Sequence, residues 1–506
     1  METLGDVLDG AVEAGRWLLL SLVLLGAVPA LCGIWQFVHV ARHRWYDHYD
    51  HSDPEHLPRT AIIVPAWNEL AVLRFSIDAM MRVNYPPDRL RLVVVDDGST
   101  DDTPILLAAK QDEYGDRVLP LRRENGGQGK AHTLNYGLDV VLADDWAEAV
   151  LITDADVVFQ PTALRRMTRH LADPQVGAVN AFIREASSKP GWVNRAIGYE
   201  YVAAQAAGRR AQNVVKAQAC LAGGAQLHSR ANLEALGGRV DTTTLAEDTV
   251  TTFLTQIDGR KVIFDGNAEC LAEEPGSVVA LWKQRLRWSR GNVQVARRFG
   301  NLFFRRSREH HLGGLWFGLM WWSTLLMPAL MIIASAALVT LWLADADTAW
   351  VAFRALWITC ALGFVFTTCY TLLLDPRVAR QSWLQAVMFP GLVSLAVMAW
   401  VLVPGPVHAA VHGSVDAAGG DWNPQTRSLL ELTAYLWVSA CMVAAWLVYR
   451  LERWGHLNWL VSPLVALVGF GPLLCSITFA AYVAEARHAE ARWDKTEKTG
   501  NVVGVR

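Results

Sequence analysis

The chain has 506 residues, of which 52% are apolar, and a mean hydropathy of +0.19. This length exceeds one ordinary domain, and the apolar content is too high for a wholly water-soluble protein, so we expect a membrane part. The formal net charge of −3 shows no basic excess and argues against a nucleic-acid partner. The seven cysteines include no Cys-x-x-Cys pair, which argues against a zinc site or a disulfide framework.

The first apolar run, from Trp17 to Val40, is longer than the core of a signal peptide and ends in arginines rather than a cleavage site. We expect it to remain as a transmembrane helix within a first segment of residues 1–46. Acidic residues precede the run, whereas Arg42 and Arg44 follow it. The positive-inside bias therefore places the amino terminus outside the membrane and the following domain in the cytosol.

That domain, residues 47–276, alternates polar and apolar residues as a globular protein does. Buried strands are expected at 60–65, 90–95 and 149–153, and helices at 78–82, 103–111 and 131–138. Strands that alternate with helices predict an α/β fold with an open, Rossmann-like sheet. In such a sheet ligands bind beyond the carboxyl ends of the strands.

Polar residues follow the first two strands of this sheet. Asn68 and Glu69 come after the first, and Asp97 comes after the second. A carboxylate at a strand tip suits a base edge or a sugar hydroxyl, although Ser99 or Asp101 could simply cap the helix that begins near Thr103. The run Asn125-Gly-Gly-Gln-Gly-Lys130 leads into the next helix, where a diphosphate could lie. The competing interpretation is a glycine-rich surface turn with a solvated lysine.

Two further acidic pairs are candidates for chemistry. Asp154 and Asp156 follow the strand at 149–153 and could share Mg²⁺ or Mn²⁺, leaving coordination positions open for phosphate oxygens. Glu247 and Asp248 precede an apolar stretch, so they could cap a helix, or one of them could take the proton from an attacking sugar hydroxyl.

A basic amphipathic helix is expected over residues 277–298, in an interfacial segment of residues 277–312. Gln284, Arg287 and Trp288 have the spacing i, i+3, i+4 and therefore lie on one face of that helix. The alternative is that Trp288 and the arginines only anchor the helix among lipid headgroups.

Five more membrane spans are expected in a helical region of residues 313–484: 315–343, 350–374, 383–403, 429–449 and 458–483. Six spans from an outside start would leave the tail, residues 485–506, outside. That tail is basic, however, which favours the cytosol. We therefore expect one span to be interfacial or re-entrant, and the candidates are the run broken at Pro390-Gly391 and the one broken at Pro328.

In order and spacing these elements, from residue 58 to about 300, resemble the membrane-embedded family 2 glycosyltransferases, which include the cellulose, chitin, hyaluronan and poly-N-acetylglucosamine synthases. The resemblance implies a GT-A catalytic domain. Ala246 departs from the threonine of many relatives, and residues 223–228 follow the family's acceptor loop only loosely. Residues 493–498 are similar to a Trp-x-Lys-Thr element of bacterial relatives.

The resemblance also implies a role for each candidate residue. Asn68, Glu69, Asp97, Lys130 and Asp154 would bind the nucleotide sugar, and Asp154 and Asp156 would bind Mg²⁺ or Mn²⁺. Asp248, with Glu247 beside it, would be catalytic, and Gln284, Arg287 and Trp288 would bind the acceptor.

The expected function is an inverting transferase in a bacterial cell membrane. It would move a sugar, most simply from a UDP-sugar, to a growing β-linked polysaccharide, coupled to secretion. One alternative is a non-processive transferase that forms a glycolipid, and another is an inactive membrane channel or scaffold. The oligomeric state is open.

Overall fold

The computed structural model describes residues 4–45, 51–417, 419, 423–490 and 502. The chain divides into two compact units. The helical unit comprises residues 1–37 and 320–483, and the α/β unit comprises residues 38–319 and 484–506. The Trp-x-Lys-Thr element at 493–498 lies outside the described residues.

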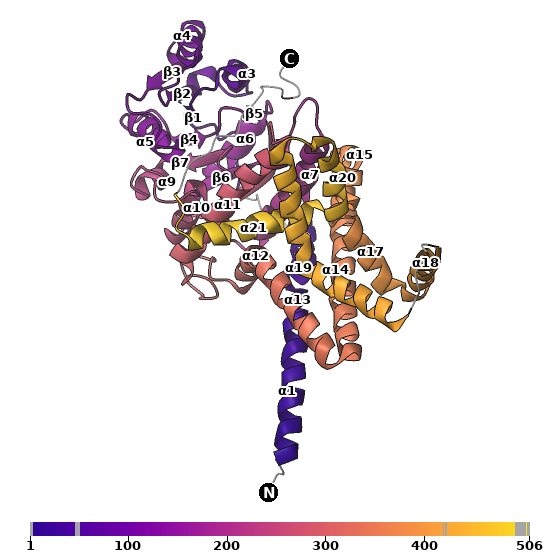
Figure 1. Ribbon diagram of the computed structural model, residues 1–506. Coiled ribbons are helices and arrows are strands. Elements are labelled where there is room, and N and C mark those ends of the chain that lie inside the picture. Colours follow the sequence, from indigo (N-terminus) through magenta and orange to yellow (C-terminus); the bar gives the residue numbers. More distant parts are fainter. Residues whose placement is uncertain (1–3, 46–50, 418, 420–422, 491–501, 503–506) are drawn as a thin grey trace. The chain divides into compact units, whose positions relative to one another are not determined.

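The α/β unit contains one eight-stranded sheet (Figure 1), with strand order β3-β2-β1-β4-β7-β6-β8-β5. Strands β1 to β4 pair in parallel, β7 is antiparallel to both of its neighbours, and β6 pairs with β8 in parallel. The strands are β1 (Thr60–Ala66), β2 (Leu90–Asp96), β3 (Val118–Arg122), β4 (Ala149–Ile152), β5 (Val158–Phe159), β6 (Val176–Glu185), β7 (Gln226–Ser229) and β8 (Lys261–Ala272).

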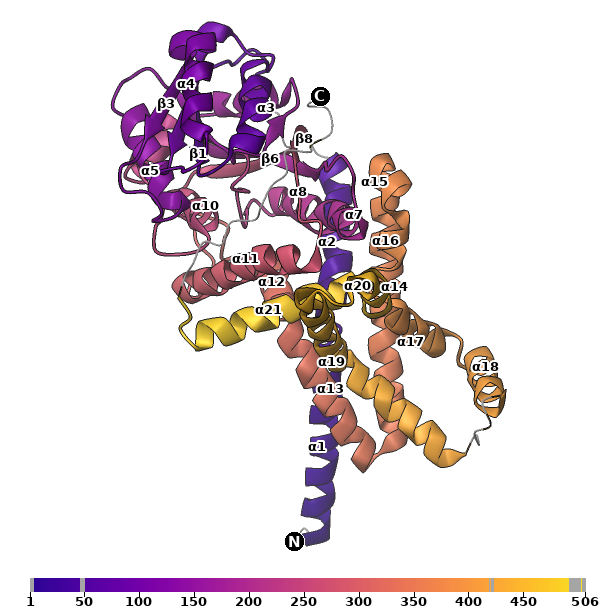
Figure 2. The same cartoon turned by 45° about the horizontal axis from the view of Figure 1, so that its top comes forward.

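Two apolar layers sandwich the sheet, because alternate residues of its central strands point to opposite faces. Ile62, Leu92 and Leu151 pack on one face with α3 (Leu70–Met81), α4 (Thr103–Tyr114) and α6 (Ala163–Thr168). Ile63 and Val93 pack on the other face with α5 (Lys130–Val141) and α9 (Arg230–Ala235). Figure 2 shows α3, α4 and α5 around the strands. The strands and helices expected in the first half of the sheet are therefore present. The helix expected at 78–82 begins eight residues earlier, and the other ends shift by at most three residues.

The remaining helices of the α/β unit surround the second half of the sheet. They are α7 (Trp192–Glu200), the π-helix η4 (Tyr201–Ala206), α8 (Ala207–Val214), α10 (Glu247–Ile257) and α11 (Val278–Phe299). Short 3-10 turns occur at η1 (Pro87–Arg89), η2 (Gly115–Arg117) and η3 (Arg169–Ala172). Ser277 caps α11, since its hydroxyl accepts a hydrogen bond from Ala280 N–H at 3.1 Å. Beyond Phe299 the expected interfacial helix gives way to turns.

Among the described residues of the helical unit, three helices are long and apolar enough to cross a membrane: α13 (Met327–Ala344), α14 (Ala346–Leu374) and α19 (Pro424–Trp454). Two further spans are possible if each of two bent pairs counts as one. One pair is α1 (Leu4–Leu25) with α2 (Val28–Trp45), and the other is α20 (Asn458–Val468) with α21 (Phe470–Ala486). Shorter helices are α12 (Leu315–Leu325), α15 (Pro376–Gln381), α16 (Trp383–Val387), α17 (Leu392–Leu402) and α18 (Pro404–Ala417).

The expected spans are thus broken more often than their hydropathy indicates. The first bends by 44° between α1 and α2, and the last bends by 97° between α20 and α21. The run 383–403 contains only an 11-residue apolar helix, because the chain turns at Pro390-Gly391. Gly391 and Gly469 both have positive φ angles, and their backbones approach so closely that a side chain at either would collide with the other turn.

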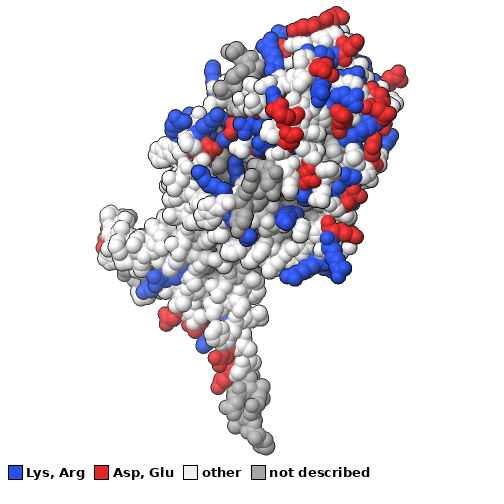
Figure 3. Space-filling view, turned by 180° about the vertical axis from the view of Figure 1, so that it is seen from behind, with Lys and Arg blue, Asp and Glu red and all other residues white. Residues whose placement is uncertain are grey.

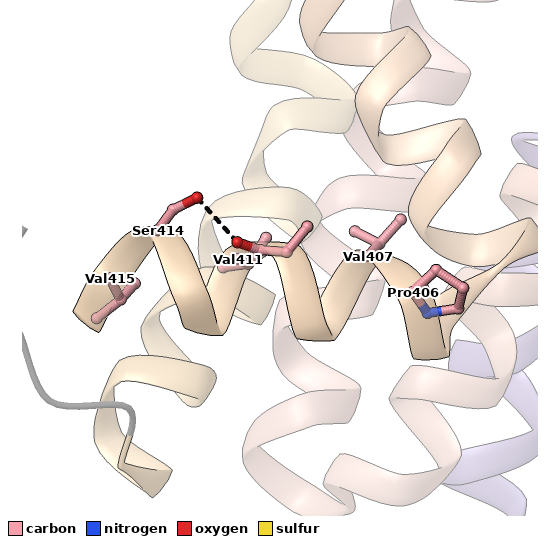
Figure 4. Close-up of a pocket in the computed structure, with 6 residues that line it drawn as sticks. Pro406, Val407, Val411, Ser414 and Val415 are labelled. Carbon is pink, nitrogen blue, oxygen red and sulfur yellow. Dashed lines mark hydrogen bonds between the residues drawn. The ribbon is translucent and has the colours of Figure 1, made fainter. Parts of the chain in front are cut away.

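The surfaces of the two units differ in charge. Lysine, arginine, aspartate and glutamate side chains are interspersed over the visible face of the α/β unit, whereas the helical unit shows few of them (Figure 3). In the helical unit a shallow hollow along α18 is lined by Pro406, Val407, Ala410, Val411, Ser414 and Val415 (Figure 4). One helix supplies the whole lining, so the hollow is not an enclosed site.

Candidate active site

The loops that follow β1 and β2 are tied together by Asn68. Its side-chain oxygen accepts hydrogen bonds from Thr100 N–H at 2.8 Å and Asp101 N–H at 3.3 Å. Its own N–H donates to Ser99 Oγ at 2.8 Å, and its φ is +52°. Asn tolerates this left-handed conformation better than most residues. Asn68 therefore fixes the shape of the carboxyl edge of the sheet where a base or ribose would lie.

Asp97 is buried and held in place from the glycine-rich loop. Its carboxylate pairs with Arg123, and it accepts a hydrogen bond from Gly127 N–H at 3.0 Å. Arg123 also donates to Gln128 Oε1 at 2.7 Å. A side chain at Gly126 would collide with the Asp97 carbonyl, so this loop needs glycine there. The loop after β3 thus rests directly on the tip of β2.

Lys130 begins α5 and reaches a group of carboxylates. Its ammonium pairs with Asp154 at the end of β4, lies 3.8 Å from Glu247 Oε1, and donates to the Gly223 carbonyl at 3.4 Å. Burial alone would lower the pKa of Lys130, but Asp154, Glu247 and Asp248 raise it above its ordinary value. Lys130 is therefore a buried cation and not the solvated lysine of a surface turn.

Glu247 and Asp248 are the first two residues of α10 and face the same region. Asp248 accepts hydrogen bonds from Gly223 N–H at 3.1 Å and from Thr249 N–H at 2.7 Å. Burial raises the pKa of Glu247, and the proximity of Lys130 offsets part of that rise. The pair occupies a helix start, as one interpretation expected, and also lies beside Lys130.

The face of α11 that carries Gln284 and Trp288 is anchored to buried acidic groups. Gln284 Nε2 donates to Glu274 Oε2 at 3.0 Å, and Trp288 lies under the Arg285 guanidinium, 4.1 Å from the ring centroid. Burial raises the pKa of Glu247, and the charge of Arg287 offsets a small part of that rise.

Two arginines depart from the expectation that α11 presents its basic residues to lipid headgroups. Arg285 pairs with Glu200 at 2.6 Å and Arg290 pairs with Glu485 at 2.7 Å, and all four side chains are at most 10% exposed. Buried ion pairs, rather than lipid, account for these two positions.

Asp154 and Asp156, the residues that the sequence predicts for a divalent cation, are both half-buried just beyond β4. Among the described residues no group of three or more His, Cys, Asp or Glu side chains is arranged to hold a metal. Two carboxylates nevertheless fit Mg²⁺ or Mn²⁺ when phosphate oxygens and water complete the coordination shell. The donor set is therefore compatible with a cation that arrives with a nucleotide.

Several residues of this site were given no specific role from the sequence. Gly223 contacts both Lys130 and Asp248, and Thr153 donates to the Gly224 carbonyl at 2.7 Å. A Gly-Gly pair before a short strand was the available signal for this loop. Glu200 gave no signal in the sequence, because its partner Arg285 is 85 residues away. Glu274 gave none either, because it lies in an unmarked stretch just before α11.

The mixed sheet, with carboxylates and a cation at the carboxyl edge of its parallel strands, fits the glycosyltransferase domain of the GT-A class that the resemblance implied. Residues 58–291 match the family model described as "Glycosyltransferase like family 2". The chain therefore carries a family 2 glycosyltransferase domain.

Curated relatives agree with this assignment. The chain is 29% identical to "Probable glycosyltransferase YdaM" of Bacillus subtilis over 52% of its own length and 61% of the relative. It is 30% identical to "Beta-monoglucosyldiacylglycerol synthase" of Synechocystis, over 47% of this chain and 48% of that one. It is 26% identical to "Poly-beta-1,6-N-acetyl-D-glucosamine synthase" of Staphylococcus aureus, over 48% and 56%. These matches span about half to three fifths of the relatives' lengths.

Among solved structures, the "Mannosyltransferase PcManGT from Pyrobaculum calidifontis in complex with GDP-Man and Mn2+" aligns with a TM-score of 0.49 and 23% sequence identity. The alignment covers 76% of this chain and 100% of that one.

Proposed function

We propose that the chain is an inverting membrane transferase that moves a sugar from a nucleotide-sugar donor, a UDP-sugar in the first instance, to a growing β-linked polysaccharide. The observation that supports this is the convergence of Lys130, Asp154, Glu247 and Asp248 around the backbone of Gly223. A cation and acidic groups at the carboxyl edge of a sheet are what transfer from a nucleoside diphosphate requires.

In the proposed step the acceptor hydroxyl attacks the anomeric carbon of the donor sugar. Asp248 accepts the hydroxyl proton while the new carbon–oxygen bond forms, and the bond to the diphosphate breaks with its electron pair leaving on the phosphate oxygen. The Gly223 N–H and Thr249 N–H hold the carboxylate of Asp248 in place. Mg²⁺ or Mn²⁺ bound at Asp154 and Asp156 would supply positive charge to the diphosphate.

Lys130 and Gln284 have separate parts in this scheme. Lys130 stands at the start of α5 and would move from Asp154 toward the departing diphosphate, helped by the positive end of the helix. Gln284 presents a buried Oε1 that lacks a hydrogen-bond partner among the described residues, and an acceptor hydroxyl would satisfy it.

A second candidate is a transferase that forms a glycolipid in one addition, because one relative of comparable identity is named as a glucosyldiacylglycerol synthase. Both candidates place the donor site in the cytosol and the acceptor at a membrane. An inactive channel or scaffold accounts less well for the family match and for the charged site.

The deciding experiment incubates the purified chain in lipid nanodiscs with a panel of radiolabelled nucleotide sugars and Mg²⁺ or Mn²⁺. Product that stays at the origin of a chromatogram and is cut by a polysaccharide hydrolase supports the polymerase. Label that extracts into organic solvent as a single species supports the glycolipid transferase instead. Absence of transfer from every donor tested, by protein with an intact thermal transition, would refute both.

A further inference from the structure

A buried ion pair joins the π-helix region to the acceptor motif on α11. Glu200 Oε2 lies 2.6 Å from Arg285 Nη2, and the two side chains are 10% and 7% exposed. Burial raises the pKa of Glu200, so the fold retains a carboxylate whose charged form is costly there. Because buried ion pairs seldom stabilise a fold more than apolar residues of similar size, this pair needs an explanation other than stability.

The ion pair holds the planar guanidinium of Arg285 over the Trp288 ring. The Arg285 guanidinium lies 4.1 Å from the centroid of Trp288 and 5.4 Å from that of Tyr201. Trp288 is half-buried, and Arg285 covers one face of its indole. A sugar that stacks on Trp288 must therefore use the opposite face, whose direction depends on where Arg285 is held.

Hydrogen bonds from the same segment also orient the side chain of Gln284. The hydroxyl of Tyr201, the residue after Glu200, donates to Glu274 Oε1 at 2.7 Å, and Gln284 Nε2 donates to Glu274 Oε2 at 3.0 Å. Because the Gln284 side-chain NH₂ donates to the Glu274 carboxylate, its Oε1 points away from Glu274. That oxygen is buried and has no hydrogen-bond partner among the residues that the structure describes. Two adjacent residues thus orient both Trp288 and Gln284.

The backbone at this point is unusual. Residues 201–206 form the π-helix, and such insertions in α-helices occur frequently at functional sites. In this chain the change from α7 to the π-helix falls between Glu200 and Tyr201, the two residues that reach toward α11.

We propose that Glu200 and Arg285 are positioning residues for the acceptor sugar: together they fix the Trp288 ring so that a saccharide stacks on its remaining face and donates a hydroxyl to Gln284. This inference rests on the proposed function and goes beyond it, because neither residue would touch the donor or the reacting atoms. It predicts that their loss weakens acceptor binding and leaves donor binding unchanged.

The test measures two affinities and one stability for each variant in nanodiscs. Binding of cellopentaose and chitopentaose reports the acceptor site, binding of UDP with Mn²⁺ reports the donor site, and Tm reports the fold. For Glu200→Gln and Arg285→Met we expect acceptor Kd to rise about tenfold, in the range of a partly desolvated cation–π contact, with donor Kd within about twofold of wild type. Arg285→Lys keeps the charge without the flat stack and should give an intermediate value.

The double variant Glu200→Gln/Arg285→Met separates positioning from structural support. Removing both charges abolishes the unpaired group that each single variant leaves, so its Tm should return toward wild type. Its acceptor Kd should stay about tenfold raised, since the stack on Trp288 is still missing. Recovery of acceptor affinity together with Tm would show that the pair only supports the fold and would overturn the proposal.

Arg91→Lys provides the matched control. Arg91 stacks on Trp146 at 3.9 Å and pairs with Asp144 at 3.4 Å, but it stands at the start of β2, at the opposite edge of the sheet. Its replacement should leave both Kd values unchanged. Failure of wild-type protein to transfer any sugar refutes the proposed function, whereas failure of wild type to bind either pentasaccharide overturns the positioning role by itself.

Discussion

Replacing Lys130 with methionine tests the charge balance of the site. Lys130 is 8% exposed at its side chain and compensates Asp154, Glu247 and Asp248. A carboxylate about 4 Å from an ammonium is attracted by ~4 kcal/mol at an effective dielectric constant of ~20, and part of that attraction offsets the cost of burying the charges. Removing one partner from a buried ionic group typically costs ~3–5 kcal/mol, because the remaining charges are uncompensated.

For a domain of this size that cost corresponds to a fall in Tm of at least ~6 °C, measured by differential scanning fluorimetry or calorimetry in metal-free buffer. Lys261→Met is the matched control, because Lys261 makes a 2.9 Å ion pair with Asp173 but is 46% exposed. Exposed pairs contribute ~0–1 kcal/mol, so its Tm should hardly change. Equal Tm values for the two variants would refute the assignment of Lys130 as the compensating cation.

Millimolar Mn²⁺ adds a second comparison to the same assay. In wild-type protein the ammonium already neutralises Asp154, so a cation gains less by binding there than in Lys130→Met. The rise in Tm on adding Mn²⁺ should be larger for Lys130→Met than for wild type. It should disappear in Lys130→Met/Asp154→Asn. A rise that persists in the double variant would place the cation elsewhere.

Three further outcomes follow from the site. Asp248→Asn should keep near-normal donor affinity while turnover falls by at least ~10²-fold, and a parallel loss of donor binding would reassign the base. Burial raises the pKa of Glu247, so its ionisation opposes folding increasingly as the pH rises from the unfolded-state pKa, and fully above the folded-state pKa. Glu247→Gln should accordingly raise Tm at neutral pH, and this gain in Tm should shrink as the pH falls toward the unfolded-state pKa. A gain in Tm that grew on acidification would contradict a raised pKa for Glu247. A cysteine at the exposed Asp112 of α4 should resist membrane-impermeant thiol reagents in intact cells and react after permeabilisation, whereas rapid labelling of intact cells would overturn a cytosolic domain.

The parts of the fold that the sequence predicted are those encoded within a few consecutive residues. Strand β2 ends at Asp96, and α5 begins at Lys130, close to where apolar runs and glycines place them. Strand tips share one edge of a parallel sheet, so Asp97 and Asp154 were expected at a common edge.

What the sequence could not supply is the choice of partner for each charge. Arg285 pairs with a glutamate 85 residues away and Arg290 with one 195 residues away. On a helical wheel both read as lipid-facing cations, because amphipathic periodicity reports polarity and not the identity of a buried partner. The bend between α1 and α2 was missed for a similar reason. A Cβ at Gly26 would lie 2.9 Å from Ala334, so the turn between α1 and α2 packs closely on α13 through a contact between distant segments.

The carboxyl-terminal segment is bound to α11. Glu485 and the carbonyls of Ala489 and Glu490 bind Arg290, so this segment belongs to the α/β unit.

The packing within the helical unit bears on the path of the chain. Phe353, near the start of α14, contacts Tyr435, near the start of α19, with ring centroids 4.8 Å apart, so the two helices begin at the same end of the bundle. The chain between the end of α14 and the start of α19 must therefore traverse the bundle, and it does so through the broken run that contains α17, where Trp400 meets Trp350 at 5.1 Å. Among the described residues three helices are long and apolar enough to cross a membrane, or up to five spans if each bent pair counts as one. With 11 residues, α17 alone is shorter than the ~20 residues that cross a hydrocarbon core, so it needs the segments on either side of it to complete the path.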